Sequence, residues 1–473
     1  MKWEIVIGLE VHSELSTKTK IFCNCSTDFS SAPNTNVCQI CSGMPGTLPV
    51  LNHEVVEYAM ALGLALNCTI ASNTKFDRKN YFYPDLPKAY QVSQLYSPIC
   101  TNGSVEIETE DGTKSIGIRQ IHMEEDAGKL VHDDLSGVTL MDYNRGGVPL
   151  LEIVTMPDFR SAQEVNAFLE QLRETLVYLD ICDGKMQEGS MRCDVNISVR
   201  PFGGELGTRT EMKNLNSLKA ITRAIAYESE RQIELIESGG AVKQETRRWD
   251  DDIGESFGMR SKENAQDYRY FPDPDLLPIL IDENWLNKVR EDMPELAAKK
   301  RERYISEFSL SQYDAMVLTK DKDISVLFEE VAQESNNPTE AANLITGEIM
   351  RLMNKTQTLA EDLKIDSAKL AVLIGLLRDG KINRTAYKDT VEAVFTDDVD
   401  PEKYIEEKGL LMISDDGAVK AIVLAVLEQN PDAVADFKAG KEKAFGFLMG
   451  QAMKQLKGAG NPDSVKEILR NCL

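Results

Sequence analysis

The sequence predicts an α+β fold, and three observations lead to this class. Segments in which apolar residues alternate with other residues, typical of β-strands, occur within roughly the first 290 residues, with helical segments interspersed. These strands and helices do not follow the regular order of βαβ units. From about residue 294 onward the apolar spacing becomes helical. We therefore expect a mixed α+β domain over residues 1–293, an all-α domain over 294–405 and a small helical tail domain over 406–473.

The predicted strands each show the period of two that one buried face produces. In the first strand, Ile7 and Leu9 point to one side, while Glu10 and His12 share the other. A carboxylate and an imidazole side by side on an otherwise apolar strand need a chemical reason. The predicted strands span residues 3–11, 116–122, 138–142, 149–155 and 191–199.

The predicted helices carry apolar residues three and four positions apart. One begins at Ser161, where Glu164 completes a capping box, and another runs from Ser217 to Ser238 and stops at a glycine pair. The others span residues 53–66, 294–307, 311–317, 324–334, 339–353, 366–379, 418–428 and 434–456.

Composition excludes several classes of protein. The 473 residues are 42% hydrophobic and 27% charged, which is typical of a globular protein, and no apolar run approaches the roughly 20 residues of a membrane span. Because Glu4 and Glu10 lie within the N-terminal strand pattern, this segment is not a signal peptide, and we expect a cytoplasmic protein without membrane contact.

The net charge of −24 argues against binding nucleic acid by bulk attraction, so any RNA contact requires a local basic patch. Such a patch is predicted near the C-terminus, although lysines so spaced are more often an ordinary solvated helix face. Its lysines, which face the single acid Glu442, are Lys438, Lys441, Lys443, Lys454 and Lys457.

Four cysteines within residues 23–41 predict a structural zinc site. Cys23 and Cys25 form one short-spaced pair, Cys38 and Cys41 form a second, and two such pairs complete a tetrahedron of thiolates. The site would be structural because it leaves no position open for a substrate. The alternative is a set of unrelated buried cysteines; disulfides are not expected in a long, apparently cytosolic chain.

The segment from His122 to Lys129 contains Glu124, Glu125 and Asp126 in succession. Crowded carboxylates repel one another unless a cation or protons neutralise them, and Mg²⁺ prefers such oxygen ligands. A solvated acidic turn is the alternative. Period two places Glu124 and Glu125 on opposite sides, and we expect Glu125 to face the metal. Glu152, in an apolar strand, is a further candidate ligand.

Further candidates lie on two later segments and one loop. On strand 191–199, Arg192, Asp194 and Asn196 share one side, a pattern that ordinary half-buried strands also show. The segment from Glu211 leads into the helix at Ser217, so Lys213 and the helix N-terminus offer positive potential to a phosphate.

The loop around Lys79 and Tyr81 combines cations with aromatic residues, which suits stacking on a base or packing against the core. Neither common nucleotide-binding fingerprint, the P-loop nor G-x-G-x-x-G, is present in the sequence.

Taken together, these motifs resemble the GatB family, the B subunits of aspartyl/glutamyl-tRNA amidotransferases, over essentially the whole chain. The strings that carry the resemblance are VIGLEVHSEL, FDRKNYFYPDLPKAYQ, HMEEDAGK, LLEIVTMPD, EGSMRCDVNISVR, EMKNLNS, QETRRWD, DYRYFPDPDLLP and KAFGFLMGQAMK. The cysteine pairs occur in only some members, so zinc rests on the spacing of the cysteines.

The resemblance implies that the first domain is a catalytic cradle. It would phosphorylate the side-chain carboxylate of Glu-tRNA(Gln) or Asp-tRNA(Asn) with ATP and Mg²⁺. Ammonia from an amidase A subunit, channelled to the site, then displaces phosphate, and a small C subunit completes a heterotrimer. The tail domain would contact tRNA. No amidase motif is visible in this chain, so we do not expect it to release ammonia from glutamine.

The implied roles fall on specific residues. The magnesium ligands would be Glu10, His12, Glu125, Glu152 and Glu211. The catalytic residues would be Glu10, Glu125, Glu211, Asp194, Asn196, Arg192 and Lys79, and the contacts to the nucleotide would be Lys213, Ser190 and Tyr81. Two alternatives remain: a non-catalytic, zinc-stabilised tRNA-binding protein, and a metal-dependent hydrolase of phosphate esters.

Overall fold

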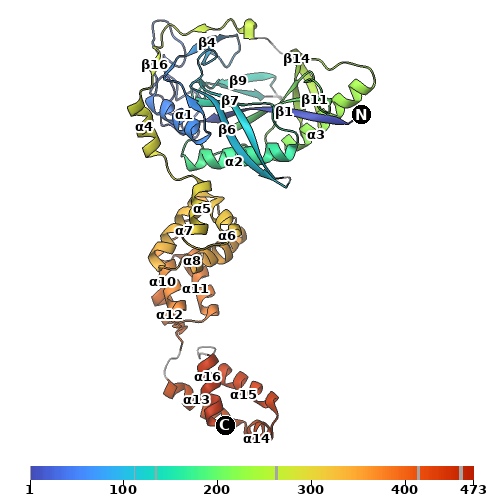
Figure 1. The fold of residues 1–473 in the computed structure, drawn as a ribbon. Helices are drawn as coiled ribbons and strands as arrows, with labels where there is room; N and C mark the ends of the chain where they lie inside the picture. Colours follow the sequence, from blue (N-terminus) through green and yellow to red (C-terminus); the bar gives the residue numbers. More distant parts are fainter. Residues whose placement is uncertain (1, 111, 134–135, 262–264, 413–415, 457–461) are drawn as a thin grey trace. The chain divides into compact units, whose positions relative to one another are not determined.

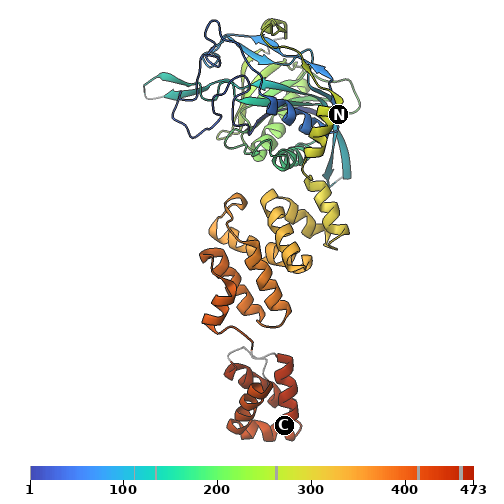
Figure 2. The same cartoon turned by 90° about the vertical axis from the view of Figure 1, so that its left-hand side faces the viewer.

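The computed structural model describes residues 2–473 except 111, 134–135, 262–264, 413–415 and 457–461. The chain divides into two compact units, Met1–Leu296 and Ala297–Leu473. All described strands lie in the first unit, and the described part of the second is helical (Figure 1 and Figure 2). The predicted α+β class is therefore confirmed.

A nine-stranded sheet forms the centre of the first unit. Its neighbouring strands are antiparallel, except that β12 and β13 are parallel. The strand that comes first in the sequence, β1, lies in the middle, so its neighbours come from distant parts of the chain. In spatial order the strands are β14 (Glu255–Ser261), β13 (Glu245–Asp250), β12 (Thr210–Lys213), β11 (Met191–Pro201), β1 (Trp3–Glu14), β10 (Pro149–Thr155), β7 (Gly112–Glu125), β6 (Cys100–Thr109) and β2 (Thr69–Ile70).

The helices that contribute most of the helical residues of the core of this unit are α1 (His53–Ala65), α2 (Ala162–Tyr178) and α3 (Leu218–Glu237). Figure 1 shows α2 passing below the sheet. On β1, the apolar residues Ile7 and Leu9 are buried in the core that these helices share with the sheet. Because successive side chains of a strand point to opposite faces, the alternate residues of β1 are turned away from this core.

The predicted helix starts of α2 and α3 are confirmed by their capping hydrogen bonds. Ser161 Oγ accepts from the backbone N–H of Glu164 at 3.2 Å, and Ser217 Oγ accepts from that of Ala220 at 3.1 Å. The Glu164 carboxylate reaches back to the N–H of Arg160 at 2.6 Å. These contacts satisfy backbone donors that a helix N-terminus leaves unpaired.

Shorter elements surround the main sheet. One small sheet contains β15 (Phe271–Pro272), β4 (Asp77–Asn80) and β5 (Tyr90–Ser93). Two pairs are formed by β16 (Ile279–Leu280) with β3 (Asn73–Thr74), and by β8 (Lys129–Asp133) with β9 (Val138–Asp142). The 3₁₀ turn η1 (Ala265–Tyr268) precedes β15, and α4 (Glu283–Asp292) follows β16. Helix α4 was not predicted from the sequence.

The second unit contains two separate groups of buried apolar residues, one between Tyr304 and Ile405 and the other between Val419 and Leu469. Among the described helices, none is long and apolar enough to cross a membrane. The elements are α5 (Ala297–Ser306), α6 (Gln312–Thr319), α7 (Lys322–Ser335), α8 (Pro338–Asn343), the π-helical η2 (Leu344–Ile349), α9 (Met350–Thr356), η3 (Ala360–Asp362), α10 (Ser367–Arg378), α11 (Arg384–Asp397), α12 (Pro401–Lys408), α13 (Asp416–Gln429), α14 (Pro431–Lys438), α15 (Glu442–Gln455) and α16 (Pro462–Cys472).

Helices α11, α12 and α16 were not predicted from the sequence, and two further details differ from the predictions for this unit. The helix predicted over residues 434–456 is divided into α14 and α15, because Gly440 has a φ of 91° that a helix does not accommodate. Of the lysines that face Glu442, Lys441 pairs with Asp436 at 2.9 Å, and Lys457 lies outside the described residues.

Candidate active site and metal sites

The face of the sheet that is turned away from the helices carries a row of charged side chains on adjacent strands. His122 of β7 is opposite Glu152 of β10, Glu152 is opposite His12 of β1, and His12 is opposite Arg192 of β11. Directly opposed residues have their Cβ atoms about 5 Å apart, so this register brings their side chains together. His122 Nε2 lies 3.0 Å and His12 Nε2 lies 3.4 Å from the same oxygen, Oε2 of Glu152.

Further carboxylates complete what we call the sheet-face cluster. Glu124 Oε1 lies 3.6 Å and Glu10 Oε1 lies 3.8 Å from His12 Nε2. Two groups of three have potential ligand atoms within 4.8 Å of one another: His12, Glu124 and Glu152, and Glu10, His12 and Asp194. The sheet-face cluster comprises Glu10, His12, His122, Glu124, Glu152 and Asp194.

The geometry of this cluster fits a small divalent ion. Octahedral Mg²⁺ with ligands at about 2.0–2.1 Å requires ligand atoms separated by roughly 2.9–4.1 Å. The distances from His12 Nε2 to Glu152, Glu124 and Glu10 are 3.4, 3.6 and 3.8 Å. The donor set of one imidazole and several carboxylates is suited to a divalent cation, although oxygen ligands alone would be more usual for Mg²⁺.

Protons partly balance the charge of the cluster when no metal is bound. Burial by itself disfavours the imidazolium of His12, but the hydrogen bond and charge of Glu152, with the charges of Glu124 and Glu10, raise its pKa to about 9. Burial opposes protonation of His122 as well, yet Glu152 and Glu124 raise its pKa to about 10. The charge of Glu152, followed by burial, raises the pKa of Glu10 to about 7.

The structure places Glu124 in the cluster where the sequence reading expected Glu125. Lys88 Nζ lies 2.5 and 2.6 Å from the two carboxylate oxygens of Glu125, and the N–H of Val92 donates to Oε1 at 2.8 Å. These contacts tie Glu125 to β5 and to the segment before it. The physical reason is the alternation along β7, which puts Glu124 on the side of His122.

Glu211 lies farther along the same face, on β12. One of its carboxylate oxygens accepts from Thr246 Oγ1 at 2.8 Å, and the other is 3.6 Å from Lys213 Nζ. The same lysine also forms an ion pair with Asp194, a member of the cluster. Lys213 therefore links Glu211 to Asp194 of the cluster, and Glu211 itself belongs to neither of the two groups of three potential ligands. Opposite Glu211 across the ladder, Asn196 has a buried side-chain oxygen with no partner among the described residues.

Arg192 is held beside the cluster by acidic partners. Its Nη2 lies 2.8 Å from Asp126 Oδ2 and 3.7 Å from Glu14 Oε1. Burial, followed by the charge of Asp126, raises the pKa of Glu14 to about 8. Ser190, just before β11, accepts the backbone N–H of Glu14 at 2.8 Å through its carbonyl oxygen. The guanidinium of Arg192 is thus held in place by the carboxylates of Asp126 and Glu14.

An aromatic group lies close to the cluster on the side of β4. Lys79 Nζ is 5.6 Å from the ring centroid of Tyr81 and 5.0 Å from that of Tyr268, and the two rings are 5.7 Å apart. Tyr268 also packs edge-to-face against Tyr270. Burial, followed by the charge of Glu124, raises the pKa values of both Tyr81 and Tyr270 above the ordinary range. The structure thus brings Tyr81 and Tyr270 near Glu124, and Lys79 lies against the rings of Tyr81 and Tyr268.

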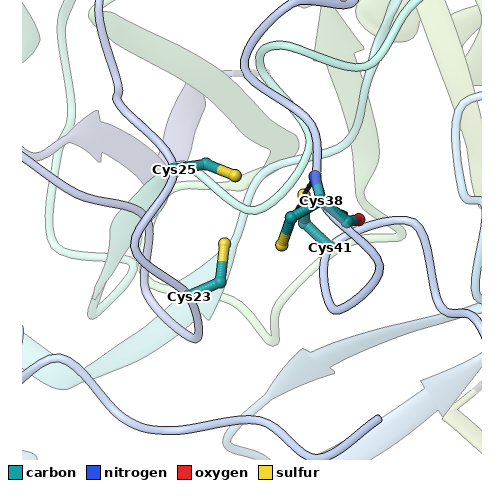
Figure 3. Close-up of side chains that lie close together, drawn as sticks. All are labelled: Cys23, Cys25, Cys38 and Cys41. Carbon is teal, nitrogen blue, oxygen red and sulfur yellow. Dashed lines mark hydrogen bonds between the residues drawn. The ribbon is translucent and has the colours of Figure 1, made fainter.

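The four cysteines of the segment 23–41, which we call the cysteine loop, converge as predicted from their spacing (Figure 3). All four Sγ atoms lie within 4.8 Å of one another, and those of Cys38 and Cys41 are 3.9 Å apart. Tetrahedral zinc with Zn–S bonds of about 2.3 Å requires sulfur atoms roughly 3.8 Å apart, so the geometry fits this metal.

The pKa values of two thiols in this loop move in opposite directions, because the hydrogen bond between Cys23 and Cys41 raises the pKa of Cys23 and lowers that of Cys41. The Cys23 thiol is the main cause that lowers the pKa of Cys41 to about 4, and the N–H of Cys38 and the charge of Lys20 act in the same direction. The four sulfur atoms therefore lie close enough together for one zinc ion to be reached by all of them.

Besides Glu124, three members of these sites were not assigned by the sequence analysis. His122 belongs to the motif HMEEDAGK. Because it lies two residues before Glu124 on a strand, the sequence could have predicted that both side chains point to the same face of the sheet. Lys88 and Lys20 carried no signal, because neither is close in sequence to the acid or thiol it contacts.

Comparisons with known proteins identify the family of the chain. Residues 5–287 match the family model described as the GatB/GatE catalytic domain, and residues 326–473 match the one described as the GatB domain. The chain is 57% identical to a protein of Lachnoclostridium phytofermentans, 55% to one of Agathobacter rectalis and 54% to one of Caldicellulosiruptor bescii. The alignments cover 99–100% of this chain and 99% of each relative.

All three relatives are named as the B subunit of an aspartyl/glutamyl-tRNA(Asn/Gln) amidotransferase. Both family models and the full-length identities point to the same family. The chain therefore belongs to the GatB family of tRNA amidotransferase B subunits.

Proposed function

We propose that this chain phosphorylates the side-chain carboxylate of Glu-tRNA(Gln), Asp-tRNA(Asn) or both, with ATP and Mg²⁺, so that ammonia can convert it to an amide. The names of the relatives support an aminoacyl-tRNA substrate. The single observation that carries the chemistry is the convergence of His12 with Glu124 and Glu152 on one sheet face.

Glu10, His12, Glu124, Glu152 and Asp194 are the residues that would hold magnesium. When bound, the ion would draw the anionic oxygens of ATP and of the substrate together and neutralise the charge of the transferred group. Glu211, which the sequence reading included among the ligands, is proposed to act one step away, because Lys213 lies between it and Asp194. Glu125 is proposed to support β7 rather than to bind the ion.

The reaction needs no protein nucleophile. A side-chain carboxylate oxygen of the substrate attacks the γ-phosphorus of ATP, the bond to the bridging oxygen breaks, and ADP leaves. Ammonia then attacks the carbonyl carbon of the mixed anhydride, inorganic phosphate leaves with the bonding electrons, and the proton lost by the nitrogen passes to the phosphate. Lys213 and Arg192, both fixed by carboxylates at the rim of the cluster, are suited to orient phosphate oxygens.

The nucleotide is proposed to lie between the cluster and the aromatic group. Tyr81 offers a ring face for stacking, and Lys79 lies over that ring with its ammonium available for a phosphate. Ser190, just before β11, is proposed to contact the nucleotide, and Asn196, in the middle of β11, is proposed to orient the substrate. The unpartnered buried oxygen of Asn196 supports this role, because a buried acceptor is costly to leave unsatisfied.

The cysteine loop is proposed to bind one structural Zn²⁺ per chain. Its four sulfur positions fill a tetrahedron, and the loop lies outside the sheet-face cluster. An amidase A subunit and a small C subunit are proposed as partners, because this chain offers no amidase motif and the relatives are named as one subunit. The exposed lysines of α14 and α15 are proposed to contact the tRNA backbone.

ATP consumption by the complex of this chain with its A and C subunits tests the proposal. ADP formation should require Glu-tRNA or Asp-tRNA and should be absent with uncharged tRNA. Glu124→Gln should lower the rate by roughly 100-fold or more, because removing a group that stabilises transferred charge costs about 10²–10³ in kcat. Glu106→Gln, at an exposed position on β6, is the matched control and should leave the rate unchanged.

Filter binding of tRNA separates catalysis from recognition in the same variants. If Glu124→Gln left both ADP formation and tRNA binding unaltered, the chain would be a non-catalytic tRNA-binding protein. ADP formation that requires no aminoacyl-tRNA would instead indicate a hydrolase.

A further inference from the structure

Lys20 is a fully buried lysine beside the cysteine loop, and the proposed function gives it no role. Its side chain is 0% exposed. Its Nζ donates to the carbonyl oxygen of Tyr143 at 3.1 Å and to Sγ of Cys41 at 3.8 Å. A sulfur atom is a weak acceptor when it is a thiol but a strong one when it is a thiolate, so the contact is best satisfied by an anionic sulfur.

The charge of this lysine has no carboxylate to balance it. Among the described residues, no aspartate or glutamate lies within 4 Å of Lys20 Nζ, whereas Lys88 and Lys213 each form an ion pair with an acid. An ammonium group that is buried without a counter-charge is strongly unfavourable. Four thiolates around one Zn²⁺ carry a net charge of about −2, which is the missing partner.

We propose that Lys20 is the counter-cation of the zinc–thiolate centre and positions it on the sheet. This inference rests on the proposed zinc site. The lysine offsets part of the negative charge of the centre and stabilises the electron density on Cys41. The thiolates are therefore less available to protons, alkylating reagents and competing chelators.

The backbone around Lys20 is arranged to hold this position. Its N–H donates to the carbonyl oxygen of Cys25, and the N–H of Ile21 donates to that of Gly147, both at 3.0 Å. A Cβ placed on Gly147 would lie 3.5 Å from Cδ of Lys20 and 3.7 Å from Cβ of Cys41. The lysine is therefore enclosed by the loop that carries the metal ligands and by the chain just before β10.

Three variants of the full-length chain test the charge. Lys20→Met removes the ammonium and its hydrogen bonds, and Lys20→Gln removes the charge but keeps a donor for Tyr143. Lys18→Met is the matched control, because it deletes the same charge at an exposed position two residues away. Transfer of zinc to a chromogenic chelator should be about 10-fold to 100-fold faster for both Lys20 variants than for the wild type and Lys18→Met.

A spectroscopic readout separates charge from packing. With Co²⁺ in place of zinc, the thiolate-to-metal charge-transfer band should move to lower energy in both Lys20 variants, because the sulfur electrons lose the stabilisation of the nearby cation. Equal release rates and unshifted bands in all four proteins would overturn the proposal. A shift in Lys20→Met alone would also overturn it, since that result indicates the hydrogen bond rather than the charge.

The wild-type protein provides a test that does not depend on how the variants fold. In acetic anhydride footprinting, Lys20 should be protected in the zinc form and labelled after zinc removal, with Lys18 labelled in both as the internal reference. Labelling of Lys20 to the same extent in both forms would contradict a role as counter-cation. Metal analysis comes first: a wild-type chain without zinc would overturn the zinc site itself, whereas zinc with unchanged Lys20 behaviour would overturn this inference alone.

Discussion

The cysteine loop and the sheet-face cluster, two ligand sets in the same unit, are assembled in opposite ways. The four sulfur ligands come from residues 23–41, a single loop. The carboxylates and imidazoles come from β1, β7, β10 and β11, and they range from Glu10 to Asp194 in the sequence. The loop needs only local folding to gather its ligands, while the cluster exists only when four strands pair in the correct register.

The two sites therefore depend on different parts of the structure. Substitutions that weaken strand pairing in the sheet should reduce metal binding by the cluster and leave zinc binding by the cysteine loop unchanged. Charge compensation differs as well, because the cluster holds protons on its own histidines, whereas the loop relies on one buried lysine. The following experiments test this contrast, in order of decreasing expected effect.

Glu125→Gln should produce the largest change in stability. It leaves Lys88 partly buried without its counter-charge, and breaking such a pair by removing one partner costs about 3–5 kcal/mol. The free energy of unfolding, measured by urea denaturation, should fall by about this amount, while zinc content stays the same.

Lys88→Met combined with Glu125→Gln is the companion variant and should recover part of the loss, because no unpaired charge is then buried. Loss of magnesium binding in Glu125→Gln with full stability, together with normal binding in Glu124→Gln, would instead restore Glu125 as the ligand.

Magnesium binding by the cluster should weaken as the pH falls. His12 must lose a proton to offer Nε2 to a metal, and its pKa without metal is about 9. Below that pH each bound ion displaces this proton, so affinity should drop by about tenfold per pH unit. Below about pH 7, protonation of Glu10 adds to the loss.

Calorimetric titration with Mg²⁺ from pH 6.5 to 9, in buffers of different ionisation enthalpy, measures both the affinity and the protons released. An affinity that does not change over this range would remove His12 from the ligand set. Zinc content measured over the same range serves as the comparison, because the cysteine loop binds its metal through sulfur and uses neither His12 nor Glu10.

Ser217→Ala should give the smallest effect. It removes the hydrogen bond that caps α3, a change that typically costs about 1 kcal/mol. Thermal unfolding should show the loss, and neither magnesium binding nor zinc content should change. A change in either metal would mean that α3 controls the register of the sheet more directly than its packing suggests.

Much of the local structure could be predicted because its causes are local. The caps at Ser161 and Ser217 follow from side chains that bond to backbone groups three residues away. The convergence of the cysteines follows from their spacing. The break at Gly440 was missed because a glycine within an apolar helical pattern is compatible with both a helix and its end.

The linear chain was enough to establish the fold class, the family, the cysteine loop and the residue types of the sheet-face cluster, because periodicity, spacing and long motifs are all present in it. Which residues meet was settled only by the folded chain. Folding placed Glu124 rather than Glu125 beside His12, gave Glu125 to Lys88, and buried Lys20 against Cys41. The physical reason is that strand register and the burial of long side chains depend on contacts between segments far apart in sequence.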